Sequence, residues 1–308
     1  MAGQVWQTNS LGGFMFSVNL SRKLRTALQP MTRFRQFCDV REAFGLGKGE
    51  TFNWNIYSDV GVAGGTLLET AQMPESNFTI SQQSLIVTEY GNSVPYTKKL
   101  DDFSEHPVTE IIQKVLKNDA RKTLDTAAFN QFNAALLRFT ATSATAGTLT
   151  TNGTPSGVAT GVLTADHVKV IADTMAERDI PTFDGNNYLA VSRPTTIRAF
   201  KDELELIHQY VSEGWHVIMN GEKGRYEGIR FIEQTNIASA NFTNSLDRVF
   251  FFGSDTVVEA FSVPEEIRGK IPGDYGRSRG VAWYANLGYG IVHTDQLQSR
   301  VVVFDSTS

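Results

Sequence analysis

The chain has 308 residues, 41% of them hydrophobic and 20% charged, which supplies enough apolar material for one elaborate domain or two modest ones. Its net charge of -5 argues against a dedicated nucleic-acid-binding protein, which would be basic. No apolar run approaches the ~20 residues that cross a bilayer, and the first residues do not resemble a secretory signal. The single cysteine, Cys38, excludes an internal disulfide and indicates folding in a reducing cytosol.

Residues 1–48 predict an N-terminal arm, because nothing in them resembles a self-contained core. A short helix over 21–29 would end at Pro30. Residues 21–48 contain seven basic and two acidic side chains, whereas residues 49–98 contain one basic and five acidic side chains. These opposite charges could pair between copies of the chain; two solvated surfaces are the alternative.

Residues 51–57 alternate between apolar and polar side chains, which predicts a half-buried strand with Phe52, Trp54 and Ile56 on one face. A glycine-rich stretch follows, and residues 84–90 predict a second strand. Together they form an extended two-stranded excursion over 49–98. Such a ribbon is marginal in water by itself, so we expect a neighbouring subunit to cover it.

Apolar residues then recur at steps of three and four, which predicts one helix over 107–137 that begins at Pro107. At ~1.5 Å per residue this helix would be about 46 Å long, close to the ~50 Å diameter of a compact globule of this chain length. We therefore expect a flattened or elongated subunit. A long core helix in an ordinary enzyme is the alternative.

Residues 139–162 predict a hairpin around Asn152 and Gly153, or a long loop. From residue 163 onward, helices and strands are mixed, which predicts an α+β domain around a central sheet. The expected helices begin near 164 and 194, and the expected strands cover 186–192, 228–234, 248–254, 256–262, 279–285 and 299–305.

No motif of an enzyme is complete in the sequence. The stretch at 45–51 fails as a phosphate-binding loop because its lysine is followed by Gly49. Gly273, Gly276 and Gly280 lack dinucleotide-loop spacing and precede an apolar strand, where we expect them to permit a bend or positive backbone dihedrals. The histidines lack metal-ligand spacing, and Cys38 has the features of a buried, inert thiol. We predict no catalytic, cofactor-binding or metal site; an active site assembled only in space is the alternative.

Four stretches, taken in order around the long helix, resemble the major capsid proteins of tailed bacteriophages, which have the Hong Kong 97-type fold shared with encapsulins. They are LLETAQMPESNFTISQQSLIVTEYGNSVPYTKKL, RDIPTFDGNNYLAVSRP, GEKGRYEGIRFIEQTNI and GDYGRSRGVAWYANLGYGIV. The resemblance covers about residues 49–304. The last stretch is similar to the coat-protein subgroup of short-tailed and related phages.

The resemblance implies an α+β capsid fold with an arm at 1–48 and an extended loop at 49–98. It further implies a peripheral domain over 99–162 and 281–308 with the spine helix at 107–137, and an axial domain over 163–280. The implied function is that of a coat protein, not an enzyme, which assembles into an icosahedral shell around a double-stranded DNA genome. An encapsulin-like compartment is the alternative, although encapsulins usually lack so long an excursion.

The implied partners are other copies of the chain in pentamers and hexamers, scaffolding, portal and decoration proteins, and packaged DNA in non-specific contact, with no membrane. Scaffolding would come from a separate protein or from a precursor region. The implied location is the virion capsid, after synthesis and assembly in the host cytoplasm. Six residues are candidates for contacts between subunits: Arg33, Arg35, Glu69, Glu75, Arg277 and Arg279. For the last two arginines, a carboxylate partner within the same subunit is also open.

Overall fold

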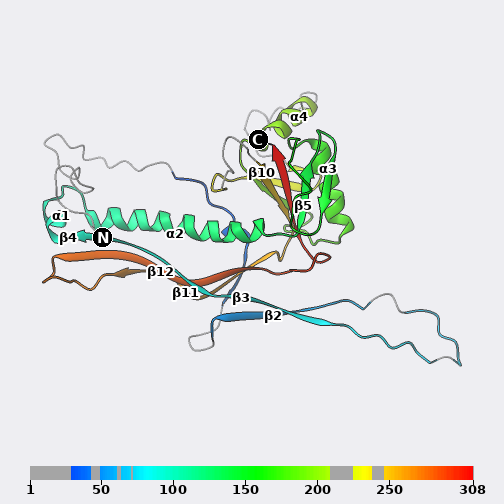
Figure 1. The fold of residues 1–308 in the computed structure, drawn as a ribbon, viewed down its shortest axis with the longest axis horizontal. Coiled ribbons are helices and arrows are strands. Elements are labelled where there is room, and N and C mark those ends of the chain that lie inside the picture. Colours follow the sequence, from blue (N-terminus) through cyan, green and yellow to red (C-terminus); the bar gives the residue numbers. More distant parts are fainter. Residues whose placement is uncertain are drawn as a thin grey trace.

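The protein is elongated and consists of a long helix over a narrow sheet, a compact α/β unit and a projecting ribbon (Figure 1). This computed structural model describes residues 29–42, 49–60, 64–70, 72–208, 225–237 and 246–307. Nearly all of the helix predicted at 21–29 lies outside the described residues. The predicted α+β class is confirmed by the mixture of helices and sheets.

The long helix α2 (Val108–Asn133) lies on a four-stranded sheet. The strand order of that sheet is β1 (Asp39–Glu42), β11 (Val257–Gly269), β12 (Ser278–Ile291) and β4 (Thr88–Thr97). The 26 residues of α2 span about 39 Å. Every fourth residue from Val108 to Leu124 is buried, and this stripe belongs to the core that the helix shares with the sheet. The short helix α1 (Lys98–Phe103) links β4 to α2 and begins where the Thr97 hydroxyl accepts a hydrogen bond from the Leu100 amide.

The compact unit is built on a seven-stranded mixed sheet. The helices α3 (Ala165–Glu177) and α4 (Arg198–His208) pack against this sheet. The strand order is β6 (Gly147–Thr150), β5 (Leu137–Ala141), β13 (Val301–Thr307), β10 (Leu246–Phe252), β7 (Tyr188–Ser192), β9 (Ile229–Glu233) and β8 (Arg225–Tyr226).

The central strand β10 is buried on both faces. Phe250 and Phe252 belong to the core shared with α2, whereas Val249 and Phe251 belong to the core shared with α3 and α4. A strand buried on both faces has a continuous apolar sequence instead of an alternating one. This explains the run of three phenylalanines within β10.

The predicted domain boundaries at 163 and 281 cut across both sheets. Strands β5 and β6, which the prediction assigns to the same domain as the long helix, lie in the seven-stranded sheet, and so does the last strand, β13. Conversely, β11, which the prediction assigns to the axial domain, lies under α2 in the four-stranded sheet. The cause is long-range pairing: β13 pairs with β5 in parallel and with β10 antiparallel, and neither pairing is visible in a contiguous segment.

Three local predictions also differ from the structure. The hairpin in this region joins β5 to β6 with its turn at 142–146, not at Asn152 and Gly153. The helix predicted to reach 137 ends at Asn133, because Leu137 already begins β5. The strand expected at 84–90 is divided between β3 (Ile80–Ile86) and β4, which starts at Thr88.

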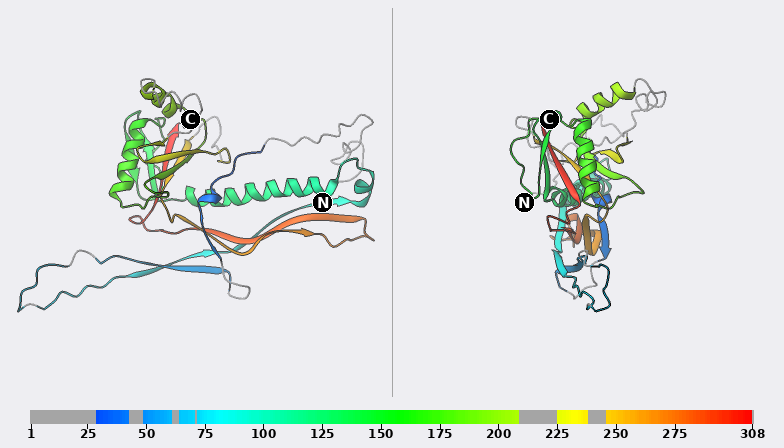
Figure 2. Two further views of the ribbon diagram at one scale, coloured as in Figure 1. Left: turned by 180° about the vertical axis from the view of Figure 1, so that it is seen from behind. Right: turned by 90° about the vertical axis from the view of Figure 1, so that its right-hand side faces the viewer.

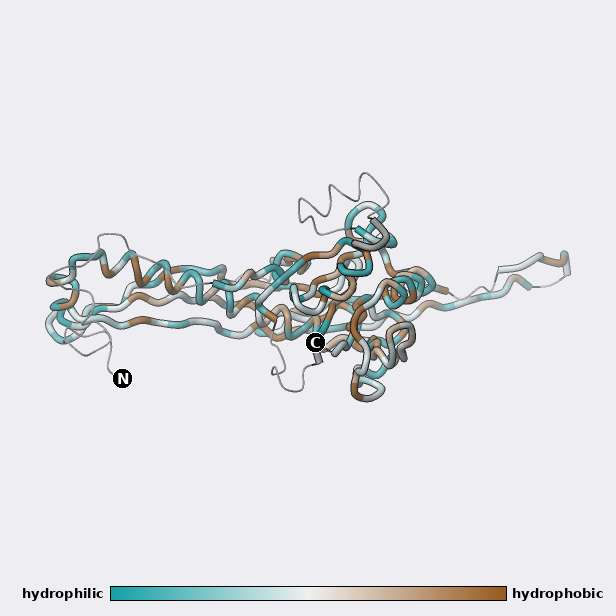
Figure 3. The backbone as a smooth tube through the Cα atoms, turned by 90° about the horizontal axis from the view of Figure 1, so that it is seen from above, coloured by the Kyte–Doolittle hydropathy of each residue, from teal (hydrophilic) through white to brown (hydrophobic). Residues whose placement is uncertain are grey.

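The predicted two-stranded excursion is present. Strand β2 (Thr51–Tyr57) pairs antiparallel with β3, from Thr51 opposite Ile86 to Tyr57 opposite Ile80. We call residues 50–86, which comprise β2, β3 and the chain between them, the ribbon. Its described part extends past the compact unit, as the views in Figure 2 and from above in Figure 3 show. The alternating exposure of β2 matches the predicted half-buried strand.

Candidate subunit interface

The far part of the ribbon exposes apolar side chains that its own chain does not cover. Leu68 retains 72% of its accessible surface and Met73 retains 66%. Hydrophobic colour marks the distal end of the ribbon in Figure 3. Isolated surface apolar residues are common, but a run of them on a two-stranded projection indicates an interaction surface. Among the described residues of this ribbon, the other exposed large apolar side chains are those of Tyr57, Val60, Leu67, Phe78, Ile80 and Ile86.

The same ribbon has only negative charges. Glu50, Asp59, Glu69 and Glu75 are its ionisable acidic groups, and no lysine or arginine occurs between residues 49 and 97. Glu69 and Glu75 are both exposed, and neither forms an ion pair with another described residue. The two predicted contact residues in the ribbon are therefore accessible to a partner.

The base of the ribbon is fixed to the four-stranded sheet. The Trp54 indole donates a hydrogen bond of 3.2 Å to the carbonyl oxygen of Val292, and Phe52 and Trp54 pack on a small core that includes Leu85 and Val258. Gly288 makes this contact close, because a Cβ there would lie 2.5 Å from the carbonyl oxygen of Ile86. The ribbon is thus a supported projection.

The described part of the arm is held on α2 and the compact unit by Phe34. This side chain is fully buried, and its ring centroid lies 5.3 Å from those of Phe129, Phe132 and Phe250. Aromatic rings at such distances add to the free energy gained by burial. Burial of Phe34 therefore fixes the position of the arm where it passes α2 and the compact unit.

Arg35, a predicted subunit contact, pairs with carboxylates of its own chain. Its Nε lies 3.0 Å from one oxygen of Glu259, its Nη2 lies 2.6 Å from the same oxygen, and Nη1 contacts Glu265. Glu259 is almost completely buried in β11, so Arg35 neutralises a charge that burial would otherwise make costly.

Arg33 differs from Arg35, because its side chain has no carboxylate partner among the described residues. Its backbone amide donates to Gln234, 3.0 Å away, and the Gln234 amide in turn donates to the buried Asp125 of α2 at 2.5 Å. Asn236 donates to the same carboxylate at 2.9 Å. Burial raises the pKa of Asp125, whereas these hydrogen bonds favour its charged form.

Arg277 and Arg279 also have carboxylate partners in their own chain. Arg279 lies 3.3 Å from Asp101, and Arg277 forms an exposed pair with Asp274 at 3.5 Å. In the turn between β11 and β12, Gly276 has a φ of +86°, which confirms the predicted positive dihedral at that glycine. Gly273 and Gly280 do not adopt positive φ values. A role for either arginine between subunits stays a prediction.

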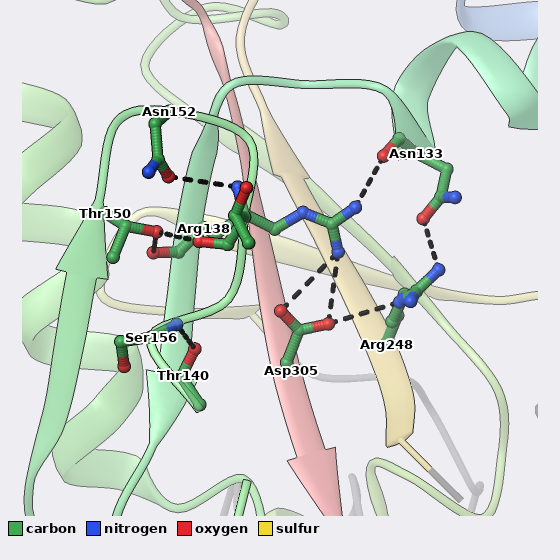
Figure 4. A network of polar contacts seen from close by, with 9 residues as sticks. Asn133, Arg138, Thr140, Thr150, Asn152, Ser156, Arg248 and Asp305 are labelled. Atoms are coloured by element: carbon green, nitrogen blue, oxygen red, sulfur yellow. Dashed lines mark hydrogen bonds and ion pairs between the residues drawn. The ribbon is translucent and has the colours of Figure 1, made fainter. Parts of the chain in front are cut away.

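A buried ionic network joins the end of α2 to the compact unit (Figure 4). Asp305 of β13 is fully buried and accepts hydrogen bonds of 3.2 Å from both Arg138 and Arg248. Arg138 also donates to the carbonyl oxygen of Asn133, and Arg248 donates to the side chain of the same residue. Burial lowers the pKa of Arg138. The network ties the last residue of α2 to three strands.

The sequence contains a signal for these two buried carboxylates. Glu259 follows Val257 and Val258 in β11, and Asp305 follows the apolar run 301–304 in β13. Such a residue is expected to have a partner when the strand is buried. Its partner could not be named, since Arg35 and Arg138 lie far away in the sequence.

The described residues contain no constellation typical of catalysis. They include no group of three or more metal-ligating side chains, and none of their helices has the length and hydrophobicity to cross a membrane. Cys38 is buried as predicted, and burial raises the pKa of its thiol well above the usual range, so that the reactive thiolate is suppressed.

The family model for phage capsid protein matches residues 82–298, which is more than half of the chain. The chain belongs to the phage capsid protein family. In this capsid protein, the region that the family model matches begins in β3 and includes α2 and most of both sheets. It also includes the residues of the ionic network other than Asp305. No curated protein matches the capsid protein in sequence at a significant level.

Solved phage capsids share the whole architecture of this capsid protein. The capsid of cyanophage P-SCSP1u superimposes with a TM-score of 0.71 at 12% identity, covering 95% of this chain and 93% of that one. The capsid of Ralstonia phage GP4 gives 0.70 at 12% identity over 98% of both chains. For cyanophage Pam1 the values are 0.66 and 16%, over 97% and 98%. The predicted Hong Kong 97-type fold is confirmed.

Proposed function

We propose that this capsid protein assembles with identical copies into the closed icosahedral shell that encloses a double-stranded DNA genome. The observation that supports this most directly is the ribbon, whose apolar side chains are left exposed by its own chain. A neighbouring copy that covers them would remove apolar surface from water, which stabilises the contact by about 25 cal/mol for each Å² buried. Head-to-tail contacts of this kind close into rings when the rotation between subunits permits.

The family match favours a phage coat over the encapsulin-like compartment and over an enzyme. We infer a structural role with no catalytic activity. Pentamers and hexamers of the chain, a scaffolding protein, a portal protein and decoration proteins are the partners that such a shell would use. We place the chain in the virion capsid after synthesis and assembly in the host cytoplasm.

The test replaces three exposed apolar residues of the ribbon in the variant Leu67→Ser, Leu68→Ser, Met73→Ser. We expect the subunit to keep its thermal unfolding midpoint, because these side chains contact solvent in the isolated chain. We expect shells to be lost or reduced at least about tenfold in yield, since the covering contact is removed. Negative-stain microscopy and sedimentation velocity measure the shells.

A matched variant replaces three exposed apolar residues elsewhere, namely Val115, Val158 and Leu297, by Ser. It should leave the yield of shells close to that of the unmodified chain. An unmodified chain that stays monomeric in the presence of its scaffolding protein would contradict the proposed function.

A further inference from the structure

One face of α2 has a stripe of positive charge that the fold does not use. Lys114, Lys117 and Arg121 are exposed and Lys122 is half-buried. None of the four forms an ion pair with any described residue. They follow one another at steps of three and four or are adjacent to a member of that series, so they share one side of the helix. We call these four residues the basic stripe.

Of the three acidic residues of α2, Glu110 in the first turn is exposed, whereas Asp119 and Asp125 point into the protein. Asp119 accepts hydrogen bonds of 2.9 Å from the Trp283 indole and the Asn92 amide on the sheet side. Asp125 is buried among Gln234, Asn236 and the arm. Between residues 111 and 126, the charges available to a partner are therefore all positive, although the whole chain has a net charge of -5.

Two hollows adjoin the stripe and share Lys122. The smaller, about 310 Å³, is lined by Arg33, Arg121 and Lys122 together with Asn118 and residues 29–32. The larger, about 730 Å³, lies between α2 and the start of β4 and is lined by hydroxyl, amide and apolar groups. Neither lining contains a carboxylate. A concave surface with cations, amides and hydroxyls suits a phosphate group.

We propose that the basic stripe and the hollow at Arg33 bind the phosphate backbone of packaged DNA, so that this face of α2 lines the interior of the shell. The proposal rests on the proposed shell function and adds which surface faces the genome. It requires no contact with bases, because lysine and arginine on phosphates give affinity without sequence preference.

Charge density favours DNA over the acidic ribbon of another copy as the occupant. The stripe covers eight residue steps of helix, about 12 Å. Duplex DNA presents one negative charge per ~1.7 Å of axis, or about seven over that length. The ribbon instead has four carboxylates spread from Glu50 to Glu75 among exposed apolar residues. Its distal part therefore requires an apolar partner surface, whereas Val115 is the one large apolar residue exposed in this part of α2.

The test measures binding of the full chain, kept unassembled, to a fluorescent DNA duplex of about 24 base pairs, by anisotropy over a series of salt concentrations. In the variant Lys114→Gln, Lys117→Gln, Arg121→Gln, three phosphate contacts are removed. The slope of log affinity against log salt is negative, and its magnitude should then decrease by about 2.7, at ~0.9 for each contact that is lost. Lys114→Arg with Lys117→Arg, which preserves charge, should keep the slope.

A matched control removes three exposed cations from the compact unit, in Lys169→Gln, Arg198→Gln, Arg230→Gln. It has the same net charge as the stripe variant, and its salt slope should stay near that of the unmodified chain. Equal slopes for both variants, or no binding by the unmodified chain, would overturn the proposal. So would a stripe variant that binds DNA normally but no longer forms shells, because the stripe would then contact another subunit. Shell formation is scored separately by microscopy, so failure of the unmodified chain to form shells contradicts the proposed function and not the DNA result.

Discussion

Asp305 and Glu259 show how single buried charges select one arrangement of distant segments. Each is almost completely inaccessible, and each pairs with an arginine more than a hundred residues away in the sequence. A buried carboxylate without a partner is strongly unfavourable, so packings that separate Asp305 from Arg138, or Glu259 from Arg35, are penalised. Asp305 needs two arginines from different strands, Arg138 and Arg248, in place at once, and it therefore restricts the packing more than Glu259 does.

The substitution Asp305→Asn should strongly destabilise the subunit. It leaves Arg138, and to a lesser extent Arg248, facing a neutral amide in a buried site. Breaking a buried pair in this way costs about 3–5 kcal/mol in the free energy of unfolding. Urea denaturation of the unassembled subunit measures the effect.

The matched control is Asp274→Asn, which breaks the exposed pair with Arg277. Asp274 has a φ of 50°, a conformation that asparagine tolerates, and exposed pairs contribute about 0–1 kcal/mol. If both variants unfolded at the same urea concentration, the network in Figure 4 would have no special role in stability.

At the scale of a single element, the stability of the ribbon depends on the contacts at its base. Two strands without further neighbours are marginal in water, and only the part of β2 and β3 nearest β12 is supported by the small core around Leu85 and Val258. The close approach at Gly288 allows that support. The direction in which the ribbon leaves the molecule is therefore set at β12.

The substitution Gly288→Ala should loosen the ribbon. The added methyl group would lie 2.5 Å from the Ile86 carbonyl oxygen, so β3 must move away from β12. We expect a cost of about 1–3 kcal/mol and faster proteolytic cleavage in residues 51–86. Limited proteolysis with mass spectrometry locates the cuts.

Gly269→Ala is the control for this element, since nothing lies within 4 Å of the position that its Cβ would occupy. It should leave the cleavage pattern unchanged. A Gly288→Ala subunit that resists protease as well as the unmodified one would show that the ribbon does not need this contact.

At the scale of the whole molecule, apolar and charged surfaces are distributed unevenly. The compact unit buries both faces of its central sheet, whereas the ribbon exposes apolar residues and presents only negative charge. Arg35 and Arg279, expected to contact neighbours, already pair within the chain. The accessible predicted contacts are therefore Glu69 and Glu75 in the ribbon, Arg33 beside α2, and Arg277, whose pair with Asp274 is exposed.

Reversing the charge of the ribbon, in Glu69→Lys with Glu75→Lys, should lower the yield of shells several-fold at low salt. The reason is that an opposite-sign surface of a neighbour would then repel the ribbon, and screening should reduce the effect as salt rises. Light scattering during assembly and counting of particles measure the yield.

The control Asp173→Lys with Glu177→Lys makes the same charge change on the exposed face of α3. Its assembly yield should follow that of the unmodified chain. An unchanged yield for the ribbon variant at low salt would contradict pairing of opposite charges between ribbon and neighbour.

The sequence by itself determined the local elements: the alternating strand at 51–57, the ribbon that it begins, and a helix whose length implied an elongated subunit. These depend on periodicities of two and 3.6 residues, which neighbouring residues are enough to reveal. Only the tertiary structure decided that β13 returns to pair with β5, that Arg35 contacts Glu259, and that Arg138 and Arg248 share Asp305. Those contacts join residues separated by more than 50 positions, and they form because folding removes both partners from water together.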